Sequence, residues 1–299
     1  MKNAKNLLAL TVLIGALAML AAGAGLFWQS QGQPYSFTNF RGEVVTISGH
    51  GLYRYDTVNS ATQARANDLV TLVLGLPLLA ISTWLALRGS LRGRLLLTGT
   101  IGFFLYTYMS MAFTAAYNPF FLVYVALFSL SLFAFLLCML SFDLKSLPER
   151  FSESLPRRGI AGVLFGAGGF LLLAWLGRIV PPLLQNTTPV LENYTTLVIQ
   201  VMDLGLIVPL AILSGWLLLR RSPWGYLLAS VAVMKFLTMG FAVSAMGVNL
   251  ALSGAAISPV ELVVFPLLTL LNLMMAVLLL RSVRSEQAAP QTVRQVRYS

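Results

Sequence analysis

Long apolar runs separated by short polar stretches dominate the chain. Eight of these runs approach the roughly 20 residues that a helix needs to cross the hydrocarbon core of a bilayer. They cover about residues 7–28, 68–87, 95–116, 119–142, 159–180, 196–219, 224–248 and 258–280. The pattern therefore predicts an all-α membrane protein with eight transmembrane helices.

The first run allows two interpretations. Two lysines, an apolar stretch and small residues at 22–25 resemble a secretory signal peptide. However, the run from Leu7 to Trp28 is as long as a spanning helix and longer than the core of a usual signal. We interpret it as a retained first helix, with a cleaved signal as the alternative.

Composition agrees with a membrane protein. Of the 299 residues, 58% are hydrophobic and 10% charged, whereas soluble domains hold about 45–50% apolar and 25% charged residues. The net charge of +10 does not indicate nucleic acid binding, because the basic residues fall in short loops and form no basic domain. The expected partner is the lipid bilayer, and other membrane subunits are possible.

The positions of the basic residues predict the orientation of the chain. In an eight-span topology, 15 of the 20 lysines and arginines lie on the side of the two termini. Basic residues near span ends tend to stay in the cytoplasm, so both termini are expected to be cytoplasmic. The exceptions are Arg41, Arg54, Arg65 and Arg178 on or near the other side, and Lys235 inside a span.

The chain also contains two pairs of similar segments. "DLVTLVLGLPLLAISTWLALR" from Asp68 resembles "DLGLIVPLAILSGWLLLR" from Asp203 with a gap, and "NPFFLVYVALFSLSLF" from Asn118 aligns without gaps to "SPVELVVFPLLTLLNL" from Ser258. We interpret these as two parallel four-helix repeats, 1–142 and 159–281, joined by a cytoplasmic linker, 143–158, and followed by a disordered tail, 282–299. Chance similarity between leucine-rich helices is the alternative.

The segment 29–67 is the longest one expected outside the membrane. Residues 44–48 and 52–58 are rich in β-branched and aromatic residues and flank a Gly-His-Gly turn, which predicts a β-hairpin. His50 at this turn is the sole histidine, and Cys138 is the sole cysteine. The chain alone therefore offers no disulfide framework and no multi-histidine metal or haem site, and we expect no metal and no cofactor.

Ionisable residues within the spans are the main functional signal, since a charge at the centre of a bilayer costs at least about 2.5–3.5 kcal/mol. Asp68, Asp203, Glu261 and Lys235 are such residues, and all four can reach the outer side of the membrane. We expect them to line an outward-open ligand pocket between the two halves, together with Tyr106 and Tyr108. Further polar residues at this level, expected to be structural, are Arg65, Asn67, Arg178 and Gln200.

Structural interpretations of the same residues remain open. Asp68 opens an apolar run and is a candidate helix cap that favours the helix dipole. Asp203 lies too deep to be a cap, so an ion pair with Lys235 on the adjoining span is our first structural expectation. Pro77, Pro209 and Pro266 interrupt three spans and free backbone carbonyls.

A resemblance covers residues 51–142. "GLYRYDTVNSATQARANDLVTLVLGLPLL" followed by "YNPFFLVYVALFSLSLF" resembles uncharacterised bacterial polytopic membrane proteins with a similar entrance to the second helix. The resemblance implies a bacterial inner-membrane location and no established activity. The leading hypothesis is binding of a small ligand or ion from the outer side, as a transporter or sensor component. The alternatives are a structural or assembly subunit and a membrane enzyme with Asp203 and Glu261 as an acid/base pair.

Overall fold

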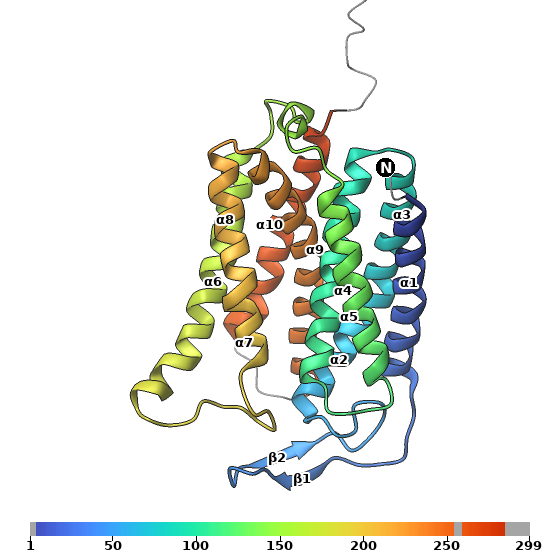
Figure 1. Cartoon of the computed structure of the whole chain (residues 1–299). Helices are drawn as coiled ribbons and strands as arrows, with labels where there is room; N and C mark the ends of the chain where they lie inside the picture. The colour runs from blue at the N-terminus through green and yellow to red at the C-terminus, as the bar shows by residue number, and fades with distance from the viewer. Residues whose placement is uncertain (1–3, 254–258, 285–299) are drawn as a thin grey trace, which may run out of the picture.

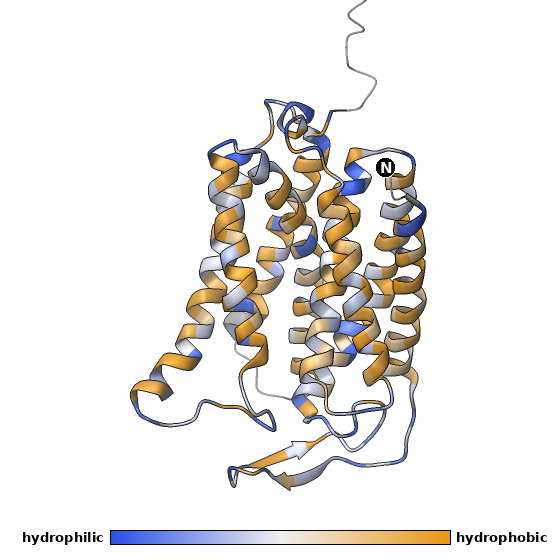
Figure 2. Cartoon of the chain, viewed as in Figure 1, coloured by the Kyte–Doolittle hydropathy of each residue, from blue (hydrophilic) through white to orange (hydrophobic). Residues whose placement is uncertain are grey.

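Eight apolar helices long enough to cross a membrane make up most of the computed structural model, which describes residues 4–253 and 259–284 without the side chains of residues 260 and 261. Helices of this length and composition are those of an integral membrane protein, as the sequence predicts. Figure 1 shows them as one bundle with a small β-hairpin at one end, which we call the hairpin end, and the N-terminus at the other. Hydrophilic residues gather mainly in the connections at the two ends (Figure 2).

Six spans are single helices, and two are divided by a π-helical turn. The single ones are α1 (Ala4–Phe27), α4 (Leu91–Thr114), α5 (Phe121–Leu140), α6 (Arg157–Leu184), α9 (Pro223–Leu252) and α10 (Pro259–Ser282). The divided ones are α2 (Val58–Val70), η1 (Thr71–Gly75) and α3 (Leu76–Leu87), and α7 (Val198–Met202), η3 (Asp203–Ile207) and α8 (Val208–Leu219).

The two π-turns have the same local cause. Pro77 is the second residue after η1, and Pro209 is the second residue after η3. Proline has no N–H, and its ring clashes with the carbonyl four residues earlier in a regular helix. The chain closes a wider turn instead, in which the N–H of Val208 bonds to the carbonyl of Asp203 five residues back. Pro266, by contrast, lies inside the continuous helix α10.

Helices α4 and α9 form the centre of the bundle. They bury larger shares of their residues than the other spans and pack directly against each other. Gly99 lies at their crossing, where a Cβ atom would come within 2.3 Å of the Met234 Cβ. On their outer sides, α3 and α5 pack against α4, while α8 and α10 pack against α9. The centre therefore joins the first four spans to the last four.

Helix α2 begins ten residues before the apolar run, so the expectation that Asp68 caps this helix is wrong. The N-cap is Thr57, whose hydroxyl accepts a hydrogen bond from the N–H of Ser60. The first turns of α2 are polar because protein surrounds them, with α1 and α9 packed alongside. Asp68 thus lies well inside the helix.

A hairpin is present, but the predicted turn at Gly-His-Gly and the predicted strand at 52–58 are wrong, and the predicted strand at 44–48 is the second strand rather than the first. Strand β1 (Tyr35–Thr38) pairs antiparallel with β2 (Val44–Ile47) around a turn held by the Asn39 side chain, which accepts from the N–H groups of Arg41 and Glu43. Residues 52–56 form turns instead, because Leu52 and Tyr53 insert their side chains into the bundle. Thr57 forms only an isolated antiparallel bridge with Ile47, and Val58 begins α2. Periodicity alone cannot distinguish this insertion from a strand.

The linker between the fourth and fifth spans packs onto the end of the last span. It contains the short 3-10 helix η2 (Leu147–Arg150), and Phe151 forms an isolated antiparallel bridge with Val283. Phe151 and Leu155 are buried in the apolar cluster of the second half. Of the predicted tail, residues 285–299 lie outside the described residues.

Candidate functional site

A cavity of about 700 Å³ lies between the two groups of spans and reaches the hairpin end. Helices α2 and α4 supply one wall, α6, α7 and α10 supply the other, and α9 lies between them. Polar side chains on its surface include Gln63, Asn67, Tyr106, Thr107, Ser110, Gln200, Asp203 and Lys235. Apolar side chains include Val163, Phe170, Leu171, Met239, Val243, Phe265 and Leu268.

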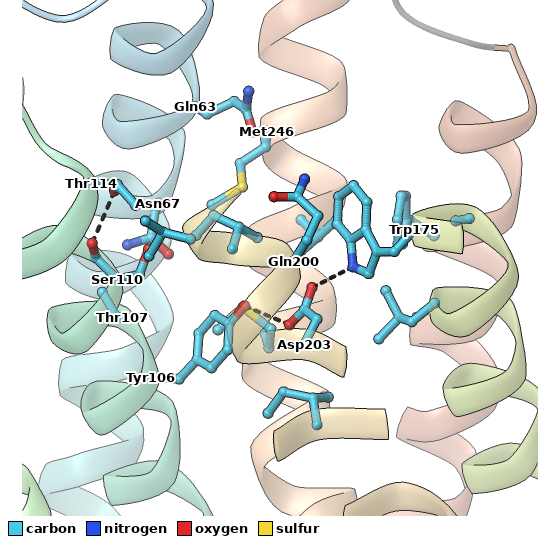
Figure 3. A pocket seen from close by; sticks show the side chains of 18 of the residues that line it. Gln63, Asn67, Tyr106, Thr107, Ser110, Thr114, Trp175, Gln200, Asp203 and Met246 are labelled. Carbon is cyan, nitrogen blue, oxygen red and sulfur yellow. Dashed lines mark hydrogen bonds between the residues drawn. The ribbon is translucent and has the colours of Figure 1, made fainter. Parts of the chain in front are cut away.

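Asp203 is held at the cavity surface by one donor from each wall. Its Oδ1 accepts a hydrogen bond of 2.6 Å from the Tyr106 hydroxyl on α4, and its Oδ2 accepts one of 2.9 Å from Trp175 Nε1 on α6. Figure 3 shows the carboxylate between these two rings. Because Asp203 opens the π-turn η3, the wider turn sets the direction of its side chain. The carboxylate is therefore buried, oriented and satisfied by neutral donors.

Lys235 does not form the expected ion pair with Asp203. No nitrogen–oxygen distance of 4.0 Å or less joins the two side chains. The Lys235 ammonium instead lies 4.1 Å from the centre of the Tyr106 ring and 5.2 Å from that of Phe236. Tyr106 thus contacts both charges, with its hydroxyl on the carboxylate and its ring face on the ammonium.

Two further amide side chains face the same cavity. Asn67 on α2 and Gln200 on α7 line it, and both residues are less than a tenth exposed. Neither side chain has a hydrogen-bond partner among the residues that the structure describes, and both are labelled in Figure 3. Both were expected to be structural polar residues, but their amide groups are available to a molecule in the cavity.

Asp68 and Tyr108 lie outside the cavity, contrary to the predicted lining. Asp68 Oδ2 accepts a 2.6 Å hydrogen bond from the Tyr53 hydroxyl, and both residues are almost fully buried. Tyr108 is stacked between the rings of Phe104 and Tyr124. Burial, followed by the nearby Asp68 carboxylate, raises the pKa of Tyr53 well above its usual value. These residues form a closed polar cluster within the first four spans.

The remaining predicted residues occupy the hairpin end or lie outside the description. Arg65 Nη2 lies 3.4 Å from the His50 carbonyl, and Arg178 Nη2 donates a 2.7 Å hydrogen bond to the Val190 carbonyl at the cavity rim. The side chain of Glu261 lies outside the described residues, so its place relative to the cavity is not part of the structure.

The segment 185–197 covers the hairpin end of the cavity, and Glu192 attaches it to α2 and the hairpin. The Glu192 carboxylate accepts hydrogen bonds of 2.5 Å from Thr57 Oγ1 and from Asn59 Nδ2. Its carbonyl accepts from Asn39 Nδ2 at 2.8 Å and from Arg41 Nη2. We call this group of contacts the Glu192 latch. Sequence reasoning missed it, although Glu192 is the only acidic residue between the fifth and sixth spans.

Asp56 is a second acidic group at the rim of the cavity. Its Oδ1 accepts a 2.9 Å hydrogen bond from the N–H of Ala116, while its Oδ2 is buried without a partner in the described structure. Burial raises the pKa of Asp56 to about 7, and the bond from Ala116 opposes this shift only in part. The protonation of this carboxyl group therefore changes near neutral pH.

The site residues are dispersed rather than clustered as metal ligands. Within residues 4–253 and 259–284, no three histidine, cysteine, aspartate or glutamate side chains come close enough to hold a metal ion. The interior of the cavity offers the carboxylate of Asp203, the ammonium of Lys235, amide groups and an apolar wall, while Asp56, Arg178 and Glu192 line its rim. Trp175, the second donor to Asp203, could not be anticipated, because nothing around it in the sequence of α6 distinguishes it from a lipid-facing aromatic residue.

Comparison with known proteins adds no family assignment. No protein-family model, no curated protein and no solved structure matches the chain. Inferences about its function therefore depend on the cavity and its residues.

Proposed function

We propose that this protein is a bacterial inner-membrane protein that binds a small molecule from the outer side, as a component of a transporter or sensor. The observation that carries the proposal is the cavity of about 700 Å³ with Asp203, Lys235 and Tyr106 on its surface. Small-molecule sites occupy about 300–1,000 Å³ and combine apolar walls with a few placed polar groups. The volume suits a small molecule better than a single ion.

The distribution of basic residues supports an outward-facing cavity. At the end opposite the hairpin, Arg92 and Arg157 lie in the first turn of a span, and Arg88 and Arg220 directly follow one. Positive charge at this position is typical of the cytoplasmic side. The hairpin end, which the cavity reaches, is then outside. In a Cys138→Ser background, a membrane-impermeant thiol reagent added to whole cells should label Phe40→Cys in the hairpin and leave Glu153→Cys in the linker unlabelled. The reverse pattern would place the cavity mouth in the cytoplasm.

Matching local features in the two halves support a repeat. Each half contains a π-turn, a proline two residues after the end of the turn, and a tryptophan seven residues after the proline. Arg88 stacks on Trp84 at 3.9 Å, and Arg220 stacks on Trp216 at 4.1 Å. Parallel repeats around a central site are one of the architectures of transporters. This similarity favours a transporter over a sensor component.

Ligand binding can be tested with a variant that fills the cavity. Ala174 lines the cavity on α6, whereas its neighbour Leu173 is exposed on the outer surface and does not line it. The thermal midpoint of the wild-type protein in nanodiscs is measured across a panel of neutral, cationic and anionic compounds. A compound bound in the cavity should raise the midpoint of the wild type and of Leu173→Trp, and should not raise that of Ala174→Trp. If no compound shifts the wild type, a structural or assembly role is favoured instead.

The groups around Asp203 favour ligand binding over an acid/base enzyme. Such an enzyme requires a second carboxyl group beside Asp203 to act as the partner acid or base. Among the side chains that the structure describes, the groups bonded to the Asp203 carboxylate are Tyr106 and Trp175, and neither is a carboxyl group. Binding without chemistry therefore explains the arrangement with fewer assumptions.

A further inference from the structure

We infer that the cavity selects an amphipathic anion, with an oxygen-bearing anionic headgroup at Lys235 and an apolar body on the opposite wall. The inference rests on the proposed function, because it specifies the chemical class of the ligand for the same cavity. Both a carboxylate and a phosphate monoester have this chemistry. The evidence is a difference between the two buried charged side chains: Asp203 accepts two hydrogen bonds, whereas the Lys235 ammonium contacts only aromatic rings among the described residues.

Lys235 is a buried cation that lacks an acceptor. The residue is only 5% exposed and lines the cavity. Its ammonium has three N–H donors, yet in the described part of the chain its contacts are the ring faces of Tyr106 and Phe236. Asp203 lies in the same cavity but not within ion-pair distance, and an ammonium buried without a hydrogen-bond acceptor is costly. A ligand oxygen would supply the missing partner.

Asp203 does not lack a partner in the same way. Both of its oxygens already accept hydrogen bonds, one from Tyr106 and one from Trp175. Tyr106 also lies between the two charges, since its hydroxyl contacts Asp203 and its ring contacts Lys235. Of these two charged groups, the one that still lacks a hydrogen-bond partner in the described structure is therefore the Lys235 ammonium, which an anionic oxygen would satisfy, and not the Asp203 carboxylate, which a cation would satisfy.

The surroundings of Lys235 fit the rest of such a ligand. Asn67 and Gln200 supply amide N–H groups without partners in the described structure, and these can donate to further oxygens of a headgroup. Helices α6 and α10 supply an apolar patch to the cavity, with Phe170, Leu171 and Leu268, beside a few polar residues such as Thr269. Burial of an alkyl or aromatic body against that patch contributes about 0.8 kcal/mol per CH₂ group.

Four probes with the same ten-carbon chain test the charge preference. Decanoate and monodecyl phosphate are anionic, decanol is neutral, and decyltrimethylammonium is cationic. Their dissociation constants are measured with wild-type protein in phosphatidylcholine nanodiscs, and empty nanodiscs correct for partitioning into lipid. At least one anion should bind about tenfold or more tightly than decanol. The stronger of the two anions then identifies the headgroup as a carboxylate or a phosphate.

Variants of Lys235 connect this preference to one side chain. Lys235→Gln should reduce the ratio of anion to decanol affinity to about one, and Lys235→Arg should retain the preference. Lys145→Gln in the linker, outside the cavity, is the matched control and should behave as the wild type. If Lys235→Gln does not fold, the wild-type ratio and Lys235→Arg still decide the question.

The outcomes separate this inference from the proposed function. Probes that bind in the wild type and not in Ala174→Trp, but with equal affinity or a preference for the cation, overturn the anion inference alone. An anion preference that survives in Lys235→Gln also overturns it. If none of the four probes binds and the wider compound panel also gives no shift, the proposed function fails as well.

Discussion

Tyr106 on α4 donates a 2.6 Å hydrogen bond to Asp203 on η3, and so connects the first four spans to the last four across the cavity. Asp203 is buried, and its carboxylate accepts this bond and one from Trp175. A hydrogen bond to a charged group contributes about 1.5–3 kcal/mol, and more is lost when the charge is left unsatisfied. The interaction therefore stabilises the relative position of the two groups of spans.

Tyr106→Phe should accordingly lower the free energy of unfolding by about 1.5–3 kcal/mol. Trp175→Phe should have a similar effect, and the double variant should lose more than the sum, because the carboxylate then has neither donor. The measurement is equilibrium unfolding in a mixed-micelle denaturant series. Tyr117→Phe is the control, since the Tyr117 side chain is exposed. Equal stability of Tyr106→Phe and Tyr117→Phe would contradict this assignment.

Gly25 on α1 makes room for the second buried acid. A Cβ atom at this position would lie 1.8 Å from Asp68 Oδ2 and 2.8 Å from the Tyr53 hydroxyl. Asp68 and Tyr53 are themselves buried and bonded to each other, so neither can move without breaking their hydrogen bond. Gly25→Ala should therefore destabilise the protein by about 1–3 kcal/mol, despite the better helix propensity of alanine.

Gly23 provides a matched control on the same helix. A Cβ atom at Gly23 meets no atom within 4 Å, so Gly23→Ala should be neutral or slightly stabilising. Thermal midpoints of the two variants in the same detergent make the comparison. A cost at both positions would indicate a general requirement for flexibility in α1 and would remove the link to Asp68.

The eight spans could be predicted because length and hydropathy suffice to define a membrane helix. Two details could not. The start of α2 at Val58 is hidden in the sequence, since its polar first turns are shielded by protein rather than lipid. The π-turns were indicated only by Pro77 and Pro209, and proline in a membrane helix is also compatible with a simple kink.

For the candidate site, the residues were easier to predict from the sequence than the contacts between them. Asp203 and Lys235, which the sequence singles out as rare charges in apolar spans, line one cavity together with Tyr106. Asp68 does not line this cavity. Tyr53, from the segment before α2, inserts into the bundle and donates a hydrogen bond to the Asp68 carboxylate. The expected ion pair failed because Tyr106 lies between the two charges, and such an insertion depends on how helices far apart in the sequence meet.

Asp56 should make stability depend on pH near neutrality. Its pKa is about 7 in the folded protein against 3.8 as the ordinary value, so the folded state holds a proton that the unfolded state releases. The free energy of unfolding should therefore fall as pH rises from about 4 to about 7, by up to about 4 kcal/mol, and then level off. Asp56→Asn, which cannot ionise, should remove this part of the decline.

Thermal midpoints between pH 5 and 8 test the assignment. Asp143→Asn is the control, because hydrogen bonds from the Ser146 hydroxyl and the Lys145 N–H lower the pKa of Asp143. Its contribution lies below pH 5 and has the opposite sign, with stability lost on acidification. A wild-type profile that is flat between pH 5 and 7, or a slope unchanged in Asp56→Asn, would show that Asp56 is not the titrating group.

The Glu192 latch should control how often the segment 185–197 leaves the cavity mouth. The Glu192 backbone has φ of 51°, a left-handed conformation that is unfavourable for a residue with a side chain, and the hydrogen bonds of its carboxylate and carbonyl offset that cost. Glu192→Gln keeps the shape but removes the charge and places an N–H₂ group against one of the two donors, Thr57 Oγ1 and Asn59 Nδ2. Opening should become on the order of tenfold to a hundredfold more frequent, because each charged hydrogen bond contributes about 1.5–3 kcal/mol.

Limited proteolysis within residues 185–197 reports this opening directly, since cleavage follows the population of the open segment when closing is fast. The control is Glu153→Gln, because the Glu153 side chain is 87% exposed and its ion pair with Arg157, at 3.9 Å, is weak. Cleavage should accelerate in Glu192→Gln alone, while its global thermal midpoint changes little. Faster cleavage accompanied by an equal loss of global stability would mean that Glu192 supports the whole bundle rather than a movable cover. Unchanged cleavage would mean that the contacts of the Glu192 carbonyl, with Asn39 and Arg41, suffice to hold the segment closed.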